Sequence, residues 1–343
     1  MVRSRKSLIL LLVGVALFVA YLALSNPFAA FAETHFDAPT YLLAIAIDYV
    51  GLLAFTASWY TIVALLDVGI GPMEAIQVMF TSMFVGWLAP IPLNTEIVRA
   101  YLIRGKKNSN MAKAVASVLV HRAFYNLAFG AIIGFTTFFV VFLNHGAIPI
   151  QKEVVTFLLM FALFSAAVFS LVLNPKILKA FYYRSPVWVR RNIINRLLGG
   201  EASSEGFDGF VTDLESVHTS MRARWGMCII SFGLVALHWV LGAVTTYVVA
   251  LSMGVHLELW VAVFIYAIVE FIQQLNWFIP SGLGIVDAGL TGAFVITGIP
   301  LSLAAALSLL TRFATNWVEI ILYTPITITY GYKELLKDYP GAK

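Results

Sequence analysis

Long apolar stretches alternate with short polar segments along the whole chain. Six of them are long enough to cross a membrane as helices, which takes about 20 residues: residues 7–25, 40–66, 111–143, 152–173, 226–252 and 299–330. Two further apolar stretches, 73–104 and 259–297, are interrupted near the middle by prolines and polar residues. The pattern predicts an all-α polytopic membrane protein with six transmembrane helices and two broken segments.

The distribution of charge predicts the orientation of these helices. Charged residues make up only 12% of the chain, against about 25% in soluble domains. If the N-terminus is cytoplasmic, 18 of the 22 lysines and arginines fall in the cytoplasmic segments 1–6, 67–72, 104–113, 174–225 and 331–343. Because cytoplasmic loops are enriched in basic residues, we expect a multi-pass protein of the cell (plasma) membrane with both termini in the cytoplasm. The basic excess then reflects topology, and no nucleic acid is expected as a partner.

Each broken segment must return to its starting side, or this charge distribution would not hold. The arms cover about 73–88 and 95–104 in the first segment, and about 259–277 and 284–297 in the second. Most of these arms are shorter than a full span. We therefore expect two re-entrant broken-helix hairpins with breaks at Pro92 and Pro280, surrounded by protein or by a water-filled cavity.

The sequences around the two breaks resemble each other. Residues 92–102 read PLNTEIVRAYL and residues 280–290 read PSGLGIVDAGL, and five positions agree at a shift of 188 residues. Downstream, LVHRAFYN at 119–126 and LLTRFATN at 309–316 agree at three positions at a shift of 190. This predicts an inverted-topology repeat of residues 1–145 and 146–343, the second half carrying the cytoplasmic loop 174–225. Many transporters have this architecture, with the site near the membrane midplane at the broken helices.

Polar residues near the breaks have the chemistry of an anion site. A helix that starts at a break points its free N–H groups and positive dipole end inward, and guanidinium groups bind phosphate well. We expect Asn94 or Thr95, and Ser281, to act as N-caps, and the glycines to allow a tight turn and close approach of a ligand. The predicted substrate-binding residues are Arg99, Arg122, Arg312, Glu96, Asp287, Ser281, Gly282, Gly284, Asn94 and Thr95.

Other polar residues in the apolar stretches are candidates for gating or coupling. They are Glu270, Glu319, His121, Asn126 and Asn316. Because charge within a membrane is costly, we expect arginines of one half to pair with carboxylates of the other, in competition with substrate or protons. The alternative is a fixed ion-pair network that only holds the helices together. Asp48 has no counterpart in the repeat, which favours a structural role.

No catalytic or cofactor motif is found in the sequence. The chain has no GxxxxGK[ST] run, no G-x-S-x-G context and no His/Cys/Asp cluster with metal spacing. We therefore expect no enzyme activity, no cofactor and no metal.

At the same residues the chain resembles the membrane domain of lysylphosphatidylglycerol synthetases, a family that includes stand-alone flippase-like proteins. The first break keeps the family residues Pro92, Glu96, Arg99, Ala100, Tyr101 and Leu102 but lacks the family's two glycines. The second keeps Pro280, Gly282, Leu283, Gly284 and Ala288, with Ser281 for a glycine and Asp287 for a glutamate. Arg122 and Arg312 match two further arginine positions, although His121 and Tyr125 replace the acids that accompany the first.

The resemblance implies movement of a polar lipid between leaflets, without the soluble domain that aminoacylates the lipid. The expected partner is a membrane lipid. A separate lipid-modifying enzyme and a homo-oligomer are also left open. Two alternative functions remain, a secondary transporter of a small solute coupled to protons or ions, and a membrane enzyme that acts on a lipid phosphate.

Overall fold

The computed structural model describes residues 2–88, 94–142, 174–189, 204–276 and 279–336, and isolated helical positions between 153 and 167. In these residues the chain is helical, without a β-strand, apart from one isolated bridge between Gly69 and Lys107. The elements are α1 (Val2–Ser25), α2 (Pro27–Glu33), α3 (Ala38–Leu65), α4 (Pro72–Leu88), α5 (Asn94–Ile103), α6 (Met111–Phe142), α8 (Pro175–Arg184), α9 (Val187–Val189), α11 (Ser204–Ala223), α12 (Trp225–Ser252), α13 (Leu259–Leu275), η2 (Pro280–Gly282), α14 (Ile285–Ile296), α15 (Leu301–Arg312), η3 (Phe313–Trp317), α16 (Val318–Ile326), η4 (Thr327–Gly331) and α17 (Tyr332–Leu336).

Several helices are long and apolar enough to span a membrane. Within the described residues there are four, namely α3, α6, α12 and the continuous run 301–334. A fifth is counted if α1 and α2, which meet at a bend of 43°, form one span. At 1.5 Å per residue, the 28 residues of α3 extend over about 42 Å. The chain is therefore a multi-pass membrane protein, while most of the remaining predicted span, 152–173, lies outside the described residues.

Helix ends follow local signals in the sequence. Prolines occupy the first turn of α2, α3 and α8, where no backbone N–H is needed for the helix. Asn174 caps α8 by accepting hydrogen bonds from the backbone N–H groups of Lys176 and Ile177. The last predicted span, 299–330, is less regular than expected, because two π-helical turns, η3 and η4, interrupt it. Such turns are rare and occur frequently at functional sites.

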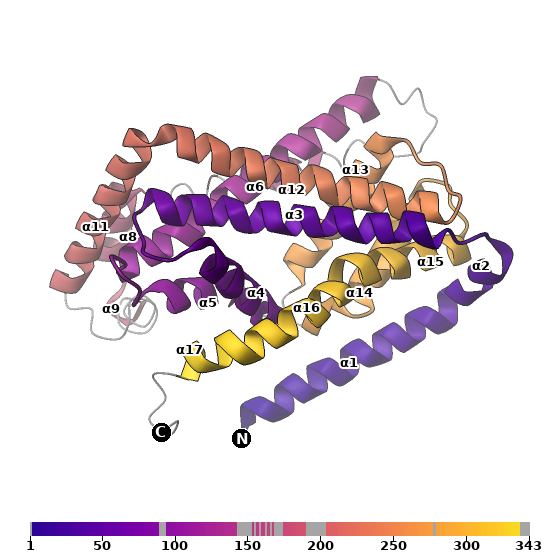
Figure 1. Cartoon of the computed structure of the whole chain (residues 1–343), viewed down its shortest axis with the longest axis horizontal. Coiled ribbons are helices and arrows are strands. Elements are labelled where there is room, and N and C mark those ends of the chain that lie inside the picture. Colours follow the sequence, from indigo (N-terminus) through magenta and orange to yellow (C-terminus); the bar gives the residue numbers. More distant parts are fainter. Residues whose placement is uncertain are drawn as a thin grey trace.

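The centre of the fold is an antiparallel pair of long helices, α3 and α12, which lie side by side along their lengths (Figure 1). Fully buried Trp59 of α3 and Trp239 of α12 belong to the core. Small polar residues let the two backbones come close. The hydroxyls of Ser58 and Ser231 lie 2.9 Å apart, and each bonds the other residue's carbonyl oxygen at 2.8–3.0 Å.

Two helical hairpins approach this centre from opposite ends of the molecule. Figure 1 shows α4 and α5 in the half that holds α8, α11 and α17, and α13 and α14 in the half that holds α2. The contacts correspond: α5 packs on α6 as α14 packs on α15, and α6 packs on α13 as α16 packs on α4. Helix α4 also contacts η2, so the inner ends of the hairpins are neighbours. Pro280 begins η2, whereas Pro92 lies outside the described residues.

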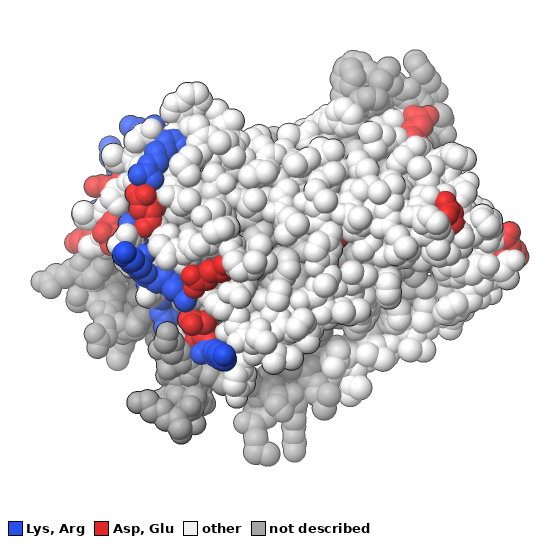
Figure 2. Space-filling model, in the orientation of Figure 1, with Lys and Arg blue, Asp and Glu red and all other residues white. Residues whose placement is uncertain are grey.

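Charged side chains gather at the ends of the molecule. Figure 2 shows lysines and arginines over one end and a broad uncharged surface beyond it. Among the described residues, these basic positions belong to the turn 104–110 and to α6, α8, α11 and α17, together with Arg224. The opposite end carries acidic residues, namely Glu33 at the end of α2, and Asp37 and Glu258 in connecting segments. This is the charge separation expected of a membrane protein with a defined orientation.

Candidate substrate-binding site

A cavity of about 710 Å³ lies where the two hairpins meet, and α3, α6, α12, α15 and α16 complete its walls. Apolar residues such as Leu52, Phe55 and Leu290 alternate with charged and amide side chains. The polar lining includes Asp48, Glu96, Arg99, Arg122, Asn126, Glu270, Gln273, Gln274, Asn276, Ser281, Arg312, Asn316 and Glu319. Most of the predicted site residues therefore share one cavity, although they come from distant parts of the sequence.

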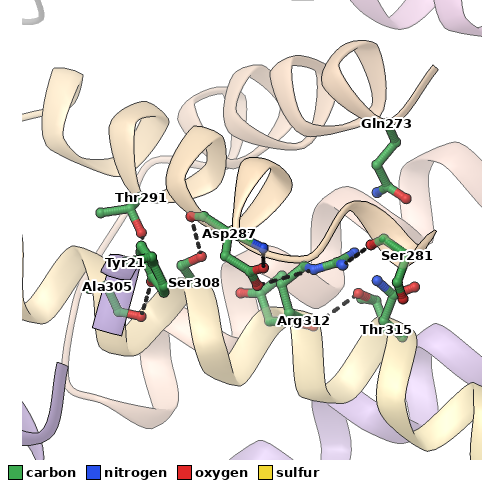
Figure 3. A network of polar contacts seen from close by, with 12 residues as sticks. Tyr21, Gln273, Ser281, Asp287, Thr291, Ala305, Ser308, Arg312 and Thr315 are labelled. Atoms are coloured by element: carbon green, nitrogen blue, oxygen red, sulfur yellow. Dashed lines mark hydrogen bonds and ion pairs between the residues drawn. The ribbon is translucent and has the colours of Figure 1, made fainter. Parts of the chain in front are cut away.

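At the second hairpin, Arg312, Asp287 and the backbone of the turn bond one another within a small space (Figure 3). The Arg312 guanidinium donates from Nε to Asp287 Oδ1 at 3.3 Å and from Nη2 to the Ser281 carbonyl oxygen at 2.5 Å. The other Asp287 oxygen accepts the backbone N–H of Gly284 at 2.9 Å. Both charged side chains are only 2% exposed. This network ties the start of α14 to the end of α15.

The N-terminus of α14 is not capped as the sequence suggested. Gly284 is the N-cap residue, and the Asp287 side chain bonds its N–H, whereas Ser281 lies in η2 with a positive φ of 64°. Ser281 contributes its carbonyl to Arg312, while its hydroxyl has no partner among the described residues. The physical reason is that the turn 280–284 continues past Ser281, so the helix begins three residues later than a Ser281 cap requires.

The glycines of this turn have backbone conformations that L side chains rarely adopt. The φ angle is 64° at Gly282 and 78° at Gly284. The close approach at Gly284, however, is made by the protein itself. A Cβ atom there would lie 2.7 Å from the backbone of Leu17 and Phe18 in α1. Gly284 therefore serves the packing of α1 on the second hairpin.

Helix α1 is also fixed to this region by a buried tyrosine. The Tyr21 hydroxyl lies 2.9 Å from Thr291 Oγ1 and 3.1 Å from the Ala305 carbonyl oxygen (Figure 3). Ser308 in turn donates to the Asp287 carbonyl oxygen at 2.9 Å. The first helix of the chain thus packs on the second hairpin, an arrangement that no sequence signal indicated.

At the first hairpin, the charged groups are held by longer contacts. Glu96 Oε1 lies 3.6 Å from Arg99 Nη2 and 3.5 Å from Arg122 Nη1. Arg99, only 1% exposed, also places Nη1 3.2 Å from His121 Nδ1 and its guanidinium 5.7 Å from the Trp59 ring. Thr95 faces Gly86 across the hairpin, and Asn94 is the first residue of α5. One carboxylate therefore serves two arginines.

Among the described residues, the ion pairs inside the cavity lie within each half, so the expectation of pairs between halves is wrong for these charges; Lys106–Glu334 and Arg224–Asp67 join the halves outside the cavity, at the basic end of the molecule. Glu96 pairs with arginines of α5 and α6, and Asp287 pairs with Arg312. The reason is local packing, because each hairpin lies directly against the helix that follows it. Inside the cavity, the polar contacts between the halves include hydrogen bonds from Trp87 Nε1 to Asn316 Oδ1 at 3.2 Å and from Tyr125 Oη to Glu270 Oε2 at 2.9 Å.

Several buried polar atoms in the cavity remain without partners among the described residues. They include the donors Nε of Arg99, Nε of Arg122, Nη1 of Arg312 and Nδ2 of Asn126, and the acceptor Oδ1 of Asn126. A buried polar group without a hydrogen bond costs about 1–3 kcal/mol, and more if it is charged. The arrangement is therefore suited to an anionic group, or to ordered water, that accepts these N–H bonds.

Three further carboxylates, those of Asp48, Glu270 and Glu319, also line the cavity. Asp48 of α3 makes a side-chain contact with Glu319 of α16, and Glu270 of α13 accepts from Tyr125 and from Gln273 Nε2 at 3.2 Å. Asp48 is thus part of the cavity, although the sequence favoured a structural role for it. Because Asp48 has no counterpart in the repeat, its contact with Glu319 could not be predicted from the sequence. This contact depends on how α3 packs near η3.

Comparison with known proteins shows the family of this chain. Residues 7–322 match the family described as the lysylphosphatidylglycerol synthase TM region. The chain belongs to this family. Two similar proteins come from Methanothermobacter thermautotrophicus (strain Delta H), and both are called UPF0104 membrane protein. One is 22% identical over 330 residues, covering 92% of this chain and 93% of the relative, and the other is 24% identical over 345 residues, covering 96% and 94%.

The family match includes all of the predicted site residues. Every predicted site residue, from Pro92 to Glu319, falls within residues 7–322. The resemblance that the two breaks suggested is therefore confirmed at the level of the family. The names of the two relatives specify a membrane protein and no activity.

Proposed function

We propose that this protein moves a phosphate-bearing or otherwise anionic lipid between the two leaflets of the cell membrane. The observation that carries the proposal is the cavity at the inner ends of two short hairpins, where buried guanidinium groups keep unpaired N–H donors. Guanidinium groups with free donors bind phosphate strongly in a site of low dielectric constant. The headgroup would enter this cavity while the tails stay in the lipid.

The proposed topology is an inverted repeat with two re-entrant hairpins and cytoplasmic termini. Helices α5 and α14 have 10 and 12 residues, about 15 and 18 Å of helix, which cannot cross a hydrocarbon layer of about 30 Å. The corresponding contacts of the two halves and the basic residues at one end (Figure 2) support this arrangement. Alternating access would then follow from movement of one half against the other.

Two features favour a lipid over a water-soluble substrate. The cavity walls combine apolar side chains with the charged groups, as an amphipathic ligand requires. The description of the family names the synthase of lysylphosphatidylglycerol, which is a phospholipid with a modified headgroup. On this reading the chain transports a lipid that a separate enzyme makes or modifies, and carries out no reaction itself.

The proposal is tested by reconstituting the purified protein into liposomes with tail-labelled fluorescent phospholipids. A membrane-impermeant quencher then reports how fast labelled lipid moves between leaflets. We expect anionic phospholipids to move, and we expect Arg122→Gln to slow this movement at least about tenfold, because it removes a charged hydrogen-bond donor to the headgroup. Arg122 is the best target because its side chain is 26% exposed, so its loss disturbs packing less than loss of Arg99 or Arg312.

The matched control is Arg222→Gln, the same substitution on the exposed surface of α11. It should transport at the wild-type rate. Wild-type rates in the Arg122→Gln variant, or no lipid movement by the wild type, would exclude the proposed mechanism. Mass spectrometry of the lipids after the assay also tests the expectation that no product is formed.

A second candidate is a small-solute transporter coupled to protons or ions. The Asp48–Glu319 contact favours it, because adjacent carboxyl groups within a membrane are suited to exchange a proton or a cation. The two functions predict different molecules bound to the purified protein. Native mass spectrometry should detect bound phospholipid if the first proposal is right, and a small solute without lipid if the second is right.

A further inference from the structure

Among the described residues that line the cavity, Asn126 is the side chain whose polar atoms are both left without a partner. It lines the cavity from α6, one helical turn beyond Arg122, and only 1% of it is exposed. Neither its amide oxygen nor its amide nitrogen has a hydrogen-bond partner among the described residues. Burying both groups unpaired is costly, so a leucine or alanine would serve packing better here. The amide is therefore best explained by a ligand that it binds.

The equivalent residue of the other half has a different role. Asn316 follows Arg312 by the same four residues, but its Oδ1 accepts the Trp87 indole N–H at 3.2 Å. That asparagine links η3 to α4 and so joins the two halves. The free amide is therefore confined to the side of Arg122, where one carboxylate, Glu96, is shared between two arginines.

The chemistry of a primary amide limits what can satisfy it. The amide nitrogen donates and the amide oxygen accepts. Phosphodiester oxygens can accept from the nitrogen, but they offer no hydrogen to the oxygen. A hydroxyl group supplies both functions, and a phosphate with a hydroxyl close by would satisfy Arg122 and Asn126 together. A trimethylammonium group has no N–H and would leave the amide oxygen unpaired.

We infer that Asn126 selects lipids whose headgroup carries a free hydroxyl next to the phosphate, such as a glycerol, inositol or sugar headgroup. The inference rests on the proposed function and adds the substrate class to it. Arg122 binds the anionic oxygens, and the Asn126 amide exchanges hydrogen bonds with the hydroxyl. Lipids that lack this hydroxyl enter the cavity but leave a buried amide unpaired.

The first test compares two lipids that differ in the hydroxyls but not in charge. Tail-labelled phosphatidylglycerol and phosphatidylethanol are placed in the same liposomes as the wild-type protein. We expect phosphatidylglycerol to move about tenfold faster, which is the effect of one buried hydrogen bond. Equal rates would overturn the inference and leave the proposed function intact, whereas movement of neither lipid would overturn both.

The second test uses variants at Asn126. Asn126→Leu should bring the two rates together by slowing phosphatidylglycerol, and Asn126→Asp should slow both anionic lipids because it adds a negative charge beside Arg122. The control is Thr315→Val, since Thr315 also lines the cavity but its hydroxyl is bonded to the Thr311 carbonyl at 2.9 Å. Its preference for phosphatidylglycerol should equal that of the wild type.

A headgroup ammonium is the competing ligand, because it too could donate to the amide oxygen. Tail-labelled phosphatidylethanolamine distinguishes it. If Asn126 selects a hydroxyl, the wild type moves phosphatidylethanolamine more slowly than phosphatidylglycerol. If the wild type prefers phosphatidylethanolamine and Asn126→Asp accelerates it, an ammonium is the ligand and the inference is wrong.

Discussion

The two hairpins have similar sequences around their breaks but hold their charges differently. In the second hairpin, Arg312 bonds Asp287 and the Ser281 carbonyl, and Asp287 bonds the backbone of Gly284. In the first hairpin, Glu96 faces two arginines at 3.5 and 3.6 Å, longer than a good charged hydrogen bond. In the second hairpin the one guanidinium has its own carboxylate, whereas the first has guanidinium groups in excess over carboxylates.

This difference suggests that the two hairpins have different roles. A network in which each charge has its own partner fixes a single geometry and is costly to break. Guanidinium groups that share one carboxylate can instead exchange that partner for an anionic ligand. We therefore expect the second hairpin to act as a rigid support for the site and the first to provide most of the substrate contacts.

The largest expected effect is loss of stability when the second network is broken. Arg312→Gln leaves the buried Asp287 carboxylate without its cation, and breaking a buried pair in this way costs about 3–5 kcal/mol. The thermal unfolding temperature in detergent should fall sharply. For Arg122→Gln it should change little, because Arg122 is partly exposed and Glu96 keeps Arg99.

The double variant Arg312→Gln/Asp287→Asn provides the control for this comparison. It removes both charges, so it should recover part of the lost stability. Equal unfolding temperatures for Arg312→Gln and Arg122→Gln would show that the two hairpins do not differ as argued.

A smaller effect is expected at the turn that supports α14. Gly284→Ala requires an alanine at a φ of 78° and brings its Cβ within 2.7 Å of the α1 backbone. Strained backbone of this kind costs about 1–3 kcal/mol, and α1 must also shift. Gly292→Ala in the same helix is the matched control, because a Cβ there meets nothing within 4 Å. It should leave the unfolding temperature unchanged or raise it slightly; a comparable loss in both variants would contradict the proposed contact with α1.

Much of this fold could be predicted from the sequence because helix length and position depend on local patterns. An expected span at 226–252 corresponds to α12 at Trp225–Ser252, and expected arms at 73–88 and 95–104 correspond to α4 and α5. Apolar runs set these lengths, and prolines and glycines set the ends. The arginines were recognisable for a different reason, since charge within an apolar run is unusual.

The partners of these charges could not be predicted, because they depend on packing between distant segments. The repeat suggested that Arg99 and Asp287 are equivalent, but equivalence in sequence does not place them in contact. Asp287 bonds Arg312 because α14 packs on α15. Asp48 and Tyr21 belong to polar networks only because of how distant helices pack. Such packing has no local sequence pattern from which it could be predicted.

The smallest expected effect on stability is at the open end of the first hairpin, where α4 begins and α5 ends. There Lys106 Nζ lies 2.7 Å from Glu74 Oε1 and 3.2 Å from Glu334 Oε2. Burial lowers the pKa of Lys106, but Glu74, Tyr330 and Glu334 outweigh it and raise that pKa above its ordinary value of 10.5. A raised lysine pKa stabilises the fold fully below pH 10.5 and loses this effect as the pH rises further. Lys106→Met should therefore cost at most about 1 kcal/mol, as for an ion pair that is partly exposed to solvent, and equally at pH 7 and pH 9. Lys107→Met changes an exposed neighbour and should cost no stability.

The contradicting outcome is a loss of stability in Lys106→Met that becomes smaller between pH 7 and pH 9. It would mean that these carboxylates do not keep the lysine charged, and that the first hairpin is no better anchored at its open end than at its inner end.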